Sequence, residues 1–307
     1  EKRLERQNKM NEFKEYTGPF VHSKETYKKI MMSYLIVFIP YLAYAIYING
    51  IKSLQIIFSP LIIVLLLELI FSLKNKNFKN IIKENFSIFG ILFFPFLLNI
   101  KTPLYIVLIS TIIGYLLHKL IFKKWYSLTI LSYTIYILLN LIINKGIYLE
   151  IINMNPIDYN FLVTSNKGFL NLLLNGSELM CPLISILAFF YLCIKKDIKY
   201  QITISSLTTI IIITLIIGLI NKSIWFPLYF ILTGGTIFIT TILATDFYSP
   251  ATKIGQILYG IFIGLLILLL RFVSPYNIAP FSIFLANTFS FAFDYLSIFL
   301  DRRKSWN

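Results

Sequence analysis

The amino-acid sequence predicts an all-α polytopic membrane protein with about ten transmembrane helices. The 307-residue chain is 57% hydrophobic and 14% charged, with a mean hydropathy of +0.76, whereas soluble domains are roughly 45 to 50% apolar. Apolar runs recur from residue 30 to residue 300, most of them close to the roughly 20 residues that a helix needs to cross a bilayer. Lys and Arg residues also alternate between the two sides of these runs, as in membrane proteins with a fixed orientation.

Ten apolar runs are interpreted as membrane spans, and two of them are irregular. The run 86–100 is short and contains Pro95, and the run 226–245 contains Gly234 and Gly235, so both are predicted to be broken or half helices. If both are re-entrant, eight full spans remain. The predicted spans are 30–48, 54–73, 86–100, 103–122, 125–144, 179–194, 198–220, 226–245, 254–273 and 278–300.

The distribution of basic residues predicts the orientation. Counted along the flanks of the spans, 22 of the 28 Lys and Arg residues fall on the side of the N-terminus and 6 on the other side. The positive-inside rule then places both termini in the cytoplasm of a bacterium, with the chain in its cytoplasmic (inner) membrane. The basic residues that give the chain its net charge of +14 lie beside the spans, and this position argues against a nucleic-acid partner. Residues 1–29 hold eight Lys or Arg and five Glu without an apolar core, so they are predicted to be a cytoplasmic arm and not a signal peptide.

The two halves of the chain correspond. Spans that begin near residues 30, 103 and 125 are followed by spans that begin near 179, 254 and 278, which predicts a duplication. Because five spans is an odd number, the second copy enters the membrane from the opposite side, as in transporters built from inverted repeats. Broken helices in the third position of each half then either line a cavity or are ordinary irregularities packed against neighbours. The predicted domains are an arm (1–29), a first repeat (30–144), an outward loop (145–178), a second repeat (179–300) and a cytoplasmic tail (301–307).

Few ionisable side chains lie inside the spans, where a charge costs at least a few kcal/mol. Glu68 is surrounded by aliphatic residues and is predicted either to handle an ion or proton or to be a hydrogen-bonded packing residue. Asp294 lies two helical turns after Asn287, which predicts one polar stripe. His118 precedes Lys119 near a cytoplasmic end, so its side chain is expected to reach the interface.

Motifs of soluble enzymes are absent from the sequence. It contains no Walker loop, G-x-G-x-x-G, H-E-x-x-H, CxxC or G-x-S-x-G pattern. Each of these patterns is the signature of one class of enzyme or cofactor site. Two histidines make a metal cluster improbable. Cys181 and Cys193 share one apolar run and are interpreted as small buried hydrophobic residues.

The stretch from Ala244 to Gly255 is the most informative part of the sequence. It reads A-T-D-F-Y-S-P-A-T-K-I-G, a polar, turn-rich break that offers hydroxyls, a carboxylate and backbone N–H groups to a ligand. Gly260 and Gly264 follow and allow close helix packing, and Arg271 follows them.

These residues resemble the D subunit of Rnf-type electron-transport complexes and the related B subunit of sodium-pumping NADH:quinone reductase. The family carries A-T-D-P-x-[ST]-[SA]-P-x-T-x-x-G, then Y-G-x-x-I-G and an Arg, and Ala244 to Arg271 are similar. Further similarities are the segment from Gly18 to Ser23 with Thr26, Asn287 with Asp294, and Glu68 at the place of a membrane glutamate.

The resemblance implies a membrane subunit that couples electron flow from ferredoxin or NADH to sodium or proton movement through flavins, FMN or riboflavin. Its implied partners are other subunits of such a complex, within the lipid bilayer. It implies two ion-pathway residues, Glu68 and Asp294, and a set of cofactor-binding residues: Thr245, Asp246, Ser249, Thr252 and Asn287.

The chain departs from the family at the covalent flavin site. Members attach FMN to the last threonine of [ST]-G-A-T in an outward loop, but the nearest segment here is Val163–Lys167, with Lys167 at the threonine position. A lysine cannot form the phosphoester bond, so the sequence argues against covalent FMN and leaves non-covalent flavin open. The family's F-G-G-x-G loop is replaced by residues 122–128 without glycines, and G-S-x-G-E-T-S survives only at Gly176–Leu179. A stand-alone channel or transporter for a small solute is the alternative function, because the family's fold resembles that of ammonium and urea transporters.

Overall fold

The computed structural model describes residues 27–75, 90–122, 126–143, 145–151, 168–174, 179–246, 248–274 and 276–304. Within these ranges the regular elements are helices, and the strand-like pairing is one antiparallel bridge between Ile151 and Tyr276. The predicted all-α polytopic class is therefore confirmed. Most of the predicted arm, Val163–Lys167 and Gly176–Glu178 lie outside the described residues, and the domain boundaries stay a prediction.

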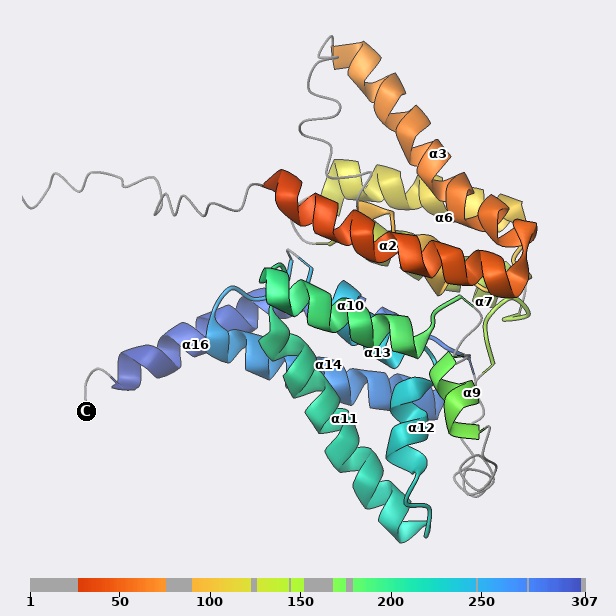
Figure 1. Ribbon diagram of the computed structural model, residues 1–307. Helices are drawn as coiled ribbons and strands as arrows, with labels where there is room; N and C mark the ends of the chain where they lie inside the picture. The colour runs from red at the N-terminus through yellow and green to blue at the C-terminus, as the bar shows by residue number, and fades with distance from the viewer. Residues whose placement is uncertain are drawn as a thin grey trace, which may run out of the picture.

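Helices follow one another through both halves of the chain (Figure 1). The first half contains α2 (Tyr27–Asn49), α3 (Ile51–Asn75), the 3-10 turn η2 (Phe94–Leu97), α6 (Leu104–Leu117), the π-helical turn η3 (His118–Phe122) and α7 (Leu128–Ile143). The second half contains α9 (Gly168–Leu174), α10 (Pro182–Lys195), α11 (Tyr200–Ile220), α12 (Phe226–Leu232), α13 (Thr236–Phe238), the π-helical turn η5 (Ile239–Leu243), α14 (Lys253–Val273), α15 (Phe281–Thr288) and α16 (Ser290–Lys304).

Nine of the predicted spans correspond to helical segments in the described residues. Five helices are long and apolar enough to cross a membrane, and two bent helix pairs bring that number to seven. Two shorter apolar helices, α7 and α10, account for two more predicted spans. Of the predicted span at 86–100, the structure describes the part from Gly90 onward, which contains η2.

The predicted break in 226–245 is confirmed, and the structure has a further break, within 278–300, that the sequence did not predict. The pair α12 and α13–η5 bends by 64°, where Gly234 and Gly235 adopt φ values of +62° and +65°, a region that favours glycine. The last predicted span, 278–300, is bent by 49° between α15 and α16. Its sequence has no Pro or Gly at the bend, which is why a continuous helix was expected there.

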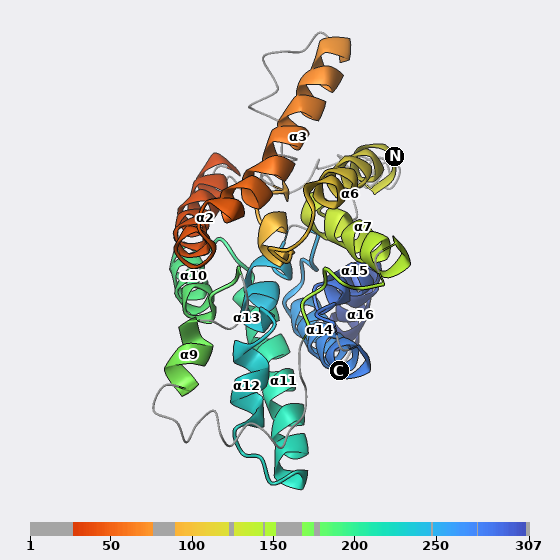
Figure 2. The same cartoon turned by 90° about the vertical axis from the view of Figure 1, so that its right-hand side faces the viewer.

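The two halves run in opposite directions. In Figure 1, α2 and α10 lie side by side but antiparallel, although each is the first long helix of its half. Figure 2 shows α3 projecting from one side of the body and α11 with α12 from the opposite side. The first described helix begins, and the last one ends, at the same end of the molecule, as an even number of spans requires.

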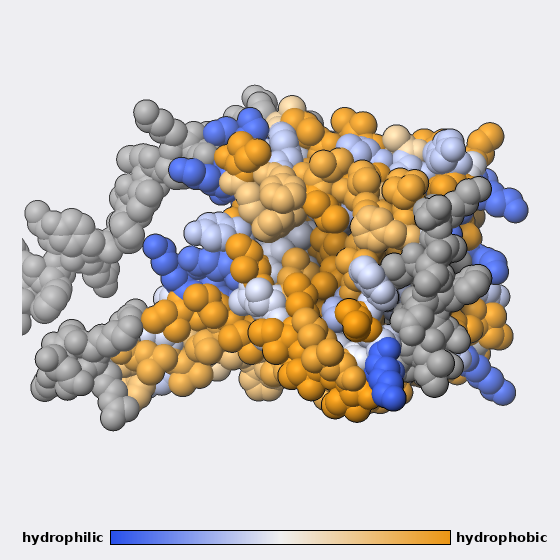
Figure 3. Space-filling view, turned by 60° about the horizontal axis from the view of Figure 1, so that its bottom comes forward, coloured by the Kyte–Doolittle hydropathy of each residue, from blue (hydrophilic) through white to orange (hydrophobic). Residues whose placement is uncertain are grey.

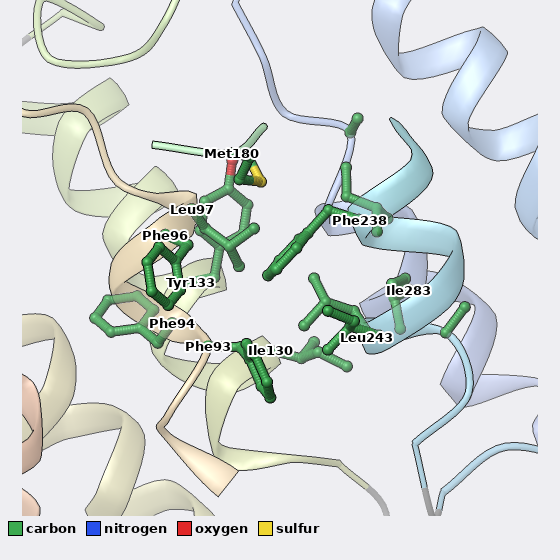
Figure 4. Packing of buried hydrophobic residues seen from close by; sticks show 14 of the residues in the cluster. Phe93, Phe94, Phe96, Leu97, Ile130, Tyr133, Met180, Phe238, Leu243 and Ile283 are labelled. Carbon is green, nitrogen blue, oxygen red and sulfur yellow. The ribbon is translucent and has the colours of Figure 1, made fainter. Parts of the chain in front are cut away.

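Aromatic and aliphatic side chains fill the contact between the halves. Phe93 and Phe96, next to the first break, lie 5.9 and 6.4 Å (between ring centroids) from Phe238, which follows the second break. Tyr41 of α2 packs 5.3 Å from the same Phe238 ring. Figure 4 shows the Phe93 and Phe96 side chains on one side of this contact and Phe238 on the other, with Leu243, Ile130 and Ile283 around them. The two broken elements therefore meet in a tightly filled core.

The surface matches a lipid environment. Many large apolar side chains are exposed, such as Ile62, Leu187 and Ile212 at 53 to 60%, and Figure 3 shows a broad apolar face with hydrophilic residues toward its two ends. Exposed apolar area on this scale is rare in soluble monomers. The surface supports burial of the helices in a bilayer.

Helices α11 and α14 pack closely at small residues, as the sequence predicts. A Cβ atom added to Gly260 would lie 2.6 Å from the Ile202 carbonyl oxygen, and one added to Gly264 would lie 2.8 Å from the Ser206 carbonyl oxygen. Only glycine permits this backbone approach, which fixes the position of α14 and of the turn before it.

Candidate functional site

The polar turn between η5 and α14 is organised by the start of α14. Thr252 is the N-cap residue, and its hydroxyl accepts a hydrogen bond from the Gly255 backbone N–H at 3.2 Å. Threonine is a preferred N-cap because its oxygen satisfies an amide that the first helical turn leaves unpaired. The Gln256 side chain also donates to the Ala251 carbonyl at 3.0 Å, so two hydrogen bonds fix the end of the turn next to α14.

Asp294 of α16 binds this turn directly. Its carboxylate accepts hydrogen bonds from the backbone N–H groups of Ala251 (3.1 Å) and Thr252 (3.0 Å) and from the Thr252 hydroxyl (2.8 Å). Ser297, one turn later on α16, donates to the Thr252 hydroxyl at 2.6 Å. A carboxylate at the N-terminal end of a helix is favoured by the helix dipole and by the free amides there. The structure thus assigns Asp294 an anchoring contact, while its predicted part in ion movement stays a prediction.

Lys199 holds the other side of the turn. Its ammonium group donates to the backbone and side-chain oxygens of Ser249 at 2.8 and 2.9 Å. Burial lowers the pKa of Lys199, while the charges of Asp246 and Asp294 act in the opposite direction. Sequence reasoning missed Lys199 because it lies about 50 residues before the turn and counted only as a flanking basic residue.

A recess of about 650 Å³ opens beside the turn, at the bend between α15 and α16. Its lining is Tyr248, Asn287, Thr288, Ser290, Phe291, Ala292 and Asp294. The bend separates Asn287 from Asp294 by a break in the helix, yet both residues face the same recess. The predicted polar stripe therefore exists, but as two short helices and not as one face of a continuous helix.

Asn287 is the polar residue of this recess with unused hydrogen-bonding capacity. The residue is 5% exposed, its side-chain oxygen accepts a hydrogen bond from the Tyr259 hydroxyl, and its amide nitrogen has no partner among the described residues. A buried N–H donor without an acceptor is costly. A ligand that presents a carbonyl or ring nitrogen would satisfy it.

Neighbouring elements contact two of the residues that line the recess, Thr288 and Tyr248. Tyr126 stacks on Phe284 at 4.7 Å and shares a 2.9 Å hydrogen bond with Thr288. His118, which begins η3, lies 3.4 Å from the Tyr248 hydroxyl and is 6% exposed. The expectation that His118 reaches the interface is therefore wrong, because its ring is buried against Tyr248.

The remaining predicted cofactor residues lie in the wall of the turn. Thr245 is buried and donates to the Thr241 carbonyl at 2.5 Å. The backbone oxygen of Asp246 accepts from Ser249 at 2.6 Å. Thr245, Asp246, Ser249 and Thr252 thus shape the turn next to the recess, whereas Asn287 lines it. Lys167 lies outside the described residues.

Glu68 belongs to a different cluster. It is 6% exposed on α3, and Lys119 of η3 lies 3.6 Å from its carboxylate. The same ammonium group donates to the Tyr115 hydroxyl at 2.8 Å and sits 4.0 Å from the Phe71 ring centroid. The structure thus gives Glu68 a charged partner, Lys119. A role of Glu68 in ion movement stays a prediction.

Arg271 closes the break between α12 and α13. It is 2% exposed, and its guanidinium donates to the Phe230 carbonyl at 2.6 Å and to the hydroxyls of Thr236 and Thr233 at 2.8 and 2.9 Å. It also lies 3.9 Å from the centre of the Phe230 ring. A cation at the C-terminal end of a half helix is favoured by the dipole, so Arg271 stabilises the break.

Taken together, the antiparallel halves, the broken helices and the polar recess define a polytopic membrane protein with a ligand-sized site at one end of its bundle. The model of the NQR2, RnfD, RnfE family matches residues 15–123 and 130–299. The chain belongs to this family.

A curated relative agrees with the family assignment. The D subunit of the ion-translocating oxidoreductase complex of Mannheimia succiniciproducens is 33% identical over 99 residues. The matched region covers 32% of this chain and 28% of the relative, so it spans under a third of either protein.

Proposed function

We propose that the chain is a membrane subunit of an ion-translocating oxidoreductase complex and that its recess binds a flavin, FMN or riboflavin, without a covalent bond. Family membership and the name of the Mannheimia relative support the complex. The observation that carries the flavin proposal is the Asn287 amide nitrogen, which has no partner in the described part of the chain and lies on a recess of about 650 Å³. Ligand pockets of this kind combine apolar walls with a few placed polar groups.

The residues present fit a flavin. A bound flavin supplies an acceptor and donor of one or two electrons. The Asn287 amide is placed to donate to a ring carbonyl or nitrogen, the Tyr248 and Thr288 hydroxyls stand on the rim, and Phe291 offers an aromatic surface. Asp294 acts through its hold on Thr252, which fixes the turn beside the recess.

The proposed complex couples electron transfer to movement of sodium or protons across the bacterial cytoplasmic membrane. The recess lies beside the start of α14 and the middle of α15–α16, toward the end of the molecule where α2 begins and α16 ends (Figure 1). Because basic residues predict that this end is cytoplasmic, the flavin would sit near the cytoplasmic side. The proposed partners are the other subunits of the complex, and nucleic acid is not among them.

The tightly packed contact between the two halves argues against a stand-alone solute channel. A channel of inverted-repeat fold needs a path between its halves, and here Phe93, Phe96 and Phe238 fill the position where the two breaks meet. Purified chain in proteoliposomes is expected to conduct no more small solute than empty vesicles. A stopped-flow swelling rate well above that of empty vesicles would favour the channel.

Flavin content after purification in mild detergent tests the proposal. Denaturation of the wild-type preparation is expected to release about one flavin per chain, and an Asn287→Ala preparation should release at least tenfold less because the free donor is lost. Asn140→Ala is the matched control, since Asn140 is also a buried asparagine but does not line the recess.

Two outcomes would contradict the proposal. If folded wild-type protein releases no flavin, the chain does not bind this cofactor. If Asn287→Ala keeps its full flavin content, the flavin does not bind at Asn287. Fluorescence of the 35.7 kDa band in a denaturing gel would show covalent attachment, contrary to the expectation from Lys167. Proteins that co-purify with the chain would identify the partners.

A further inference from the structure

Four side chains of the first half meet where α3 packs against α6 and η3. Glu68 and Phe71 lie one helical turn apart on α3, and Tyr115 and Lys119 lie one turn apart at the end of α6 and in η3. Residues three or four positions apart share one face of a helix. The two helices are in contact, and the Phe71 and Tyr115 rings are 5.9 Å apart between their centroids. The four residues therefore form one cluster between two spans.

The Lys119 ammonium group contacts all the other members of this cluster. It donates to the Tyr115 hydroxyl at 2.8 Å and lies 3.6 Å from the Glu68 carboxylate. It also lies 4.0 Å from the centroid of the Phe71 ring and 5.2 Å from that of the Tyr115 ring. A cation within about 6 Å of a ring centroid is attracted to the ring face. A carboxylate, a hydroxyl oxygen and two aromatic rings thus stabilise one ammonium group.

The groups in this cluster suit an ammonium ion better than a metal ion. Glu68 and Tyr115 offer the oxygens of one carboxylate and one hydroxyl, whereas Mg²⁺ and Ca²⁺ take about six or more oxygen ligands. Aromatic ring faces bind ammonium and alkylammonium ions, and a primary ammonium group has three N–H donors for the oxygens around it. Glu68, Phe71 and Tyr115 therefore form a position for a primary ammonium ion, called the ammonium position below.

Glu68 and Lys119 differ in how firmly they are held. The Glu68 side chain is 8% exposed, and a buried carboxylate without a counter-charge is costly. The Lys119 side chain is 30% exposed, and the long apolar stem of a lysine lets its ammonium group reach an interface. The carboxylate is thus fixed between the helices, while the cation beside it is on a flexible side chain with access to the surface.

We propose that Lys119 is a tethered counter-ion that fills the ammonium position and keeps external cations away from Glu68. The ligand class of this position is a primary alkylammonium ion, which the chain supplies itself. The proposal goes beyond the proposed function, since it involves neither the recess nor a flavin. An ion that passes Glu68 must first displace the Lys119 ammonium group, so Lys119 controls access to this part of the predicted ion pathway.

Rescue of Lys119→Ala by an added amine tests the ammonium position. In detergent, full-length Lys119→Ala should unfold at a lower temperature than the wild type because the position is empty. Propylammonium chloride should then raise its unfolding midpoint by about 2–5 °C over choline chloride at equal ionic strength, when the amine is in roughly tenfold excess over Kd. Sodium chloride should give no such rise. The wild type should not respond to propylammonium, because its own lysine fills the position.

Two further variants serve as controls for the rescue. Lys119→Ala combined with Glu68→Gln should not respond to propylammonium, because the carboxylate that attracts the amine is gone. Lys195→Ala should not respond either. Lys195 is exposed and lies over the Tyr191 ring at 6.0 Å, so this variant removes a lysine beside an aromatic ring at the surface and leaves the ammonium position filled.

Amine labelling of the wild-type chain gives a second measurement that does not depend on the folding of Lys119→Ala. A water-soluble N-hydroxysuccinimide ester should acylate Lys119 roughly tenfold more slowly than the exposed Lys195, a factor that corresponds to about 1.4 kcal/mol. Glu68→Gln should remove most of this difference, because it releases the Lys119 ammonium group. Mass spectrometry of the two lysine-containing peptides gives both rates.

Several outcomes would overturn the proposal. They are a folded Lys119→Ala that propylammonium does not stabilise, a rescue that survives Glu68→Gln, a wild type that responds as strongly as Lys119→Ala, and equal labelling rates for Lys119 and Lys195. A rescue by sodium as large as that by propylammonium would overturn the ligand class. None of these measurements involves flavin, so their failure leaves the proposed function in place.

Discussion

The Thr252 hydroxyl donates a 2.8 Å hydrogen bond to the Asp294 carboxylate and so ties the start of α14 to α16. The same hydroxyl caps α14 by accepting from Gly255. One threonine therefore joins the polar turn, the helix that follows it and the helix that lines the recess. The geometry of the recess depends on this contact as much as on the residues in its wall.

Removal of the Asp294 carboxylate should loosen the turn. Asp294→Ala leaves the N–H groups of Ala251 and Thr252 without their acceptor, and we expect a loss of about 1–3 kcal/mol in unfolding free energy, because hydrogen bonds to a charged group are involved but the residue is partly exposed. Asp294→Asn keeps one acceptor oxygen and should lose less. Equal unfolding midpoints for Asp294→Ala and the wild type would show that the anchor has no energetic weight.

Substitution of Gly260 should separate α11 from α14. A Cβ at this position meets the Ile202 carbonyl at 2.6 Å, so Gly260→Ala is expected to destabilise the protein by about 1–3 kcal/mol through overpacking. In a helix without this contact, the same change stabilises by up to about 1 kcal/mol. Detergent unfolding gives the sign, and a stabilised Gly260→Ala would contradict the close packing. Leu265→Ala, at an exposed position of the same helix, is the control.

Sequence patterns were sufficient to predict the long apolar helices and the break at Gly234 and Gly235. Apolar length and glycine placement are local properties, and they predicted α2, α3, α11 and α14 within a few residues. The bend between α15 and α16 was not predictable in this way, because no Pro or Gly marks it.

The candidate site was predictable only in part, because some of its residues stand out in the sequence and others depend on tertiary contacts. Asn287 and the polar turn stand out as hydrophilic residues in an apolar chain. Lys199, just before α11, contacts the turn, and Tyr126, just before α7, contacts Thr288 in the wall of the recess. Such contacts between residues far apart in the sequence depend on tertiary packing. The partner of Glu68 likewise became visible only when η3 placed Lys119 beside α3.

Tyr248 should ionise at unusually high pH. Burial, aided by the negative charge of Asp246, raises the pKa of its hydroxyl from 10.0 to about 12. The difference in tyrosinate absorbance between the wild type and Tyr248→Phe is therefore expected to appear near pH 12. Because the folded-state pKa is the higher one, Tyr248 contributes stability below about pH 10 that is lost as the pH rises through about 12. A difference centred at pH 10 would place the hydroxyl in open solvent.

Glu68 and Lys119 should be energetically coupled. Their charged atoms lie 3.6 Å apart, with side-chain exposures of 8% for Glu68 and 30% for Lys119. Lys119→Met strands a buried carboxylate, and we expect a loss of about 1–3 kcal/mol, below the range for fully buried pairs because Lys119 is partly solvated. In Glu68→Gln the carboxylate is already neutral, so the further change Lys119→Met should cost much less.

The double-mutant cycle separates the ion pair from simple packing. A coupling free energy of about 1 kcal/mol or more is expected if the charges interact. Additive effects of the two substitutions would instead mean that Lys119 acts through its contacts with Phe71 and Tyr115. Glu68 would then lack an effective counter-charge in the folded protein. A buried ionisable residue inside a membrane span is a candidate for an ion pathway, so additivity would remove the structural explanation of Glu68 and leave the predicted ion-handling role.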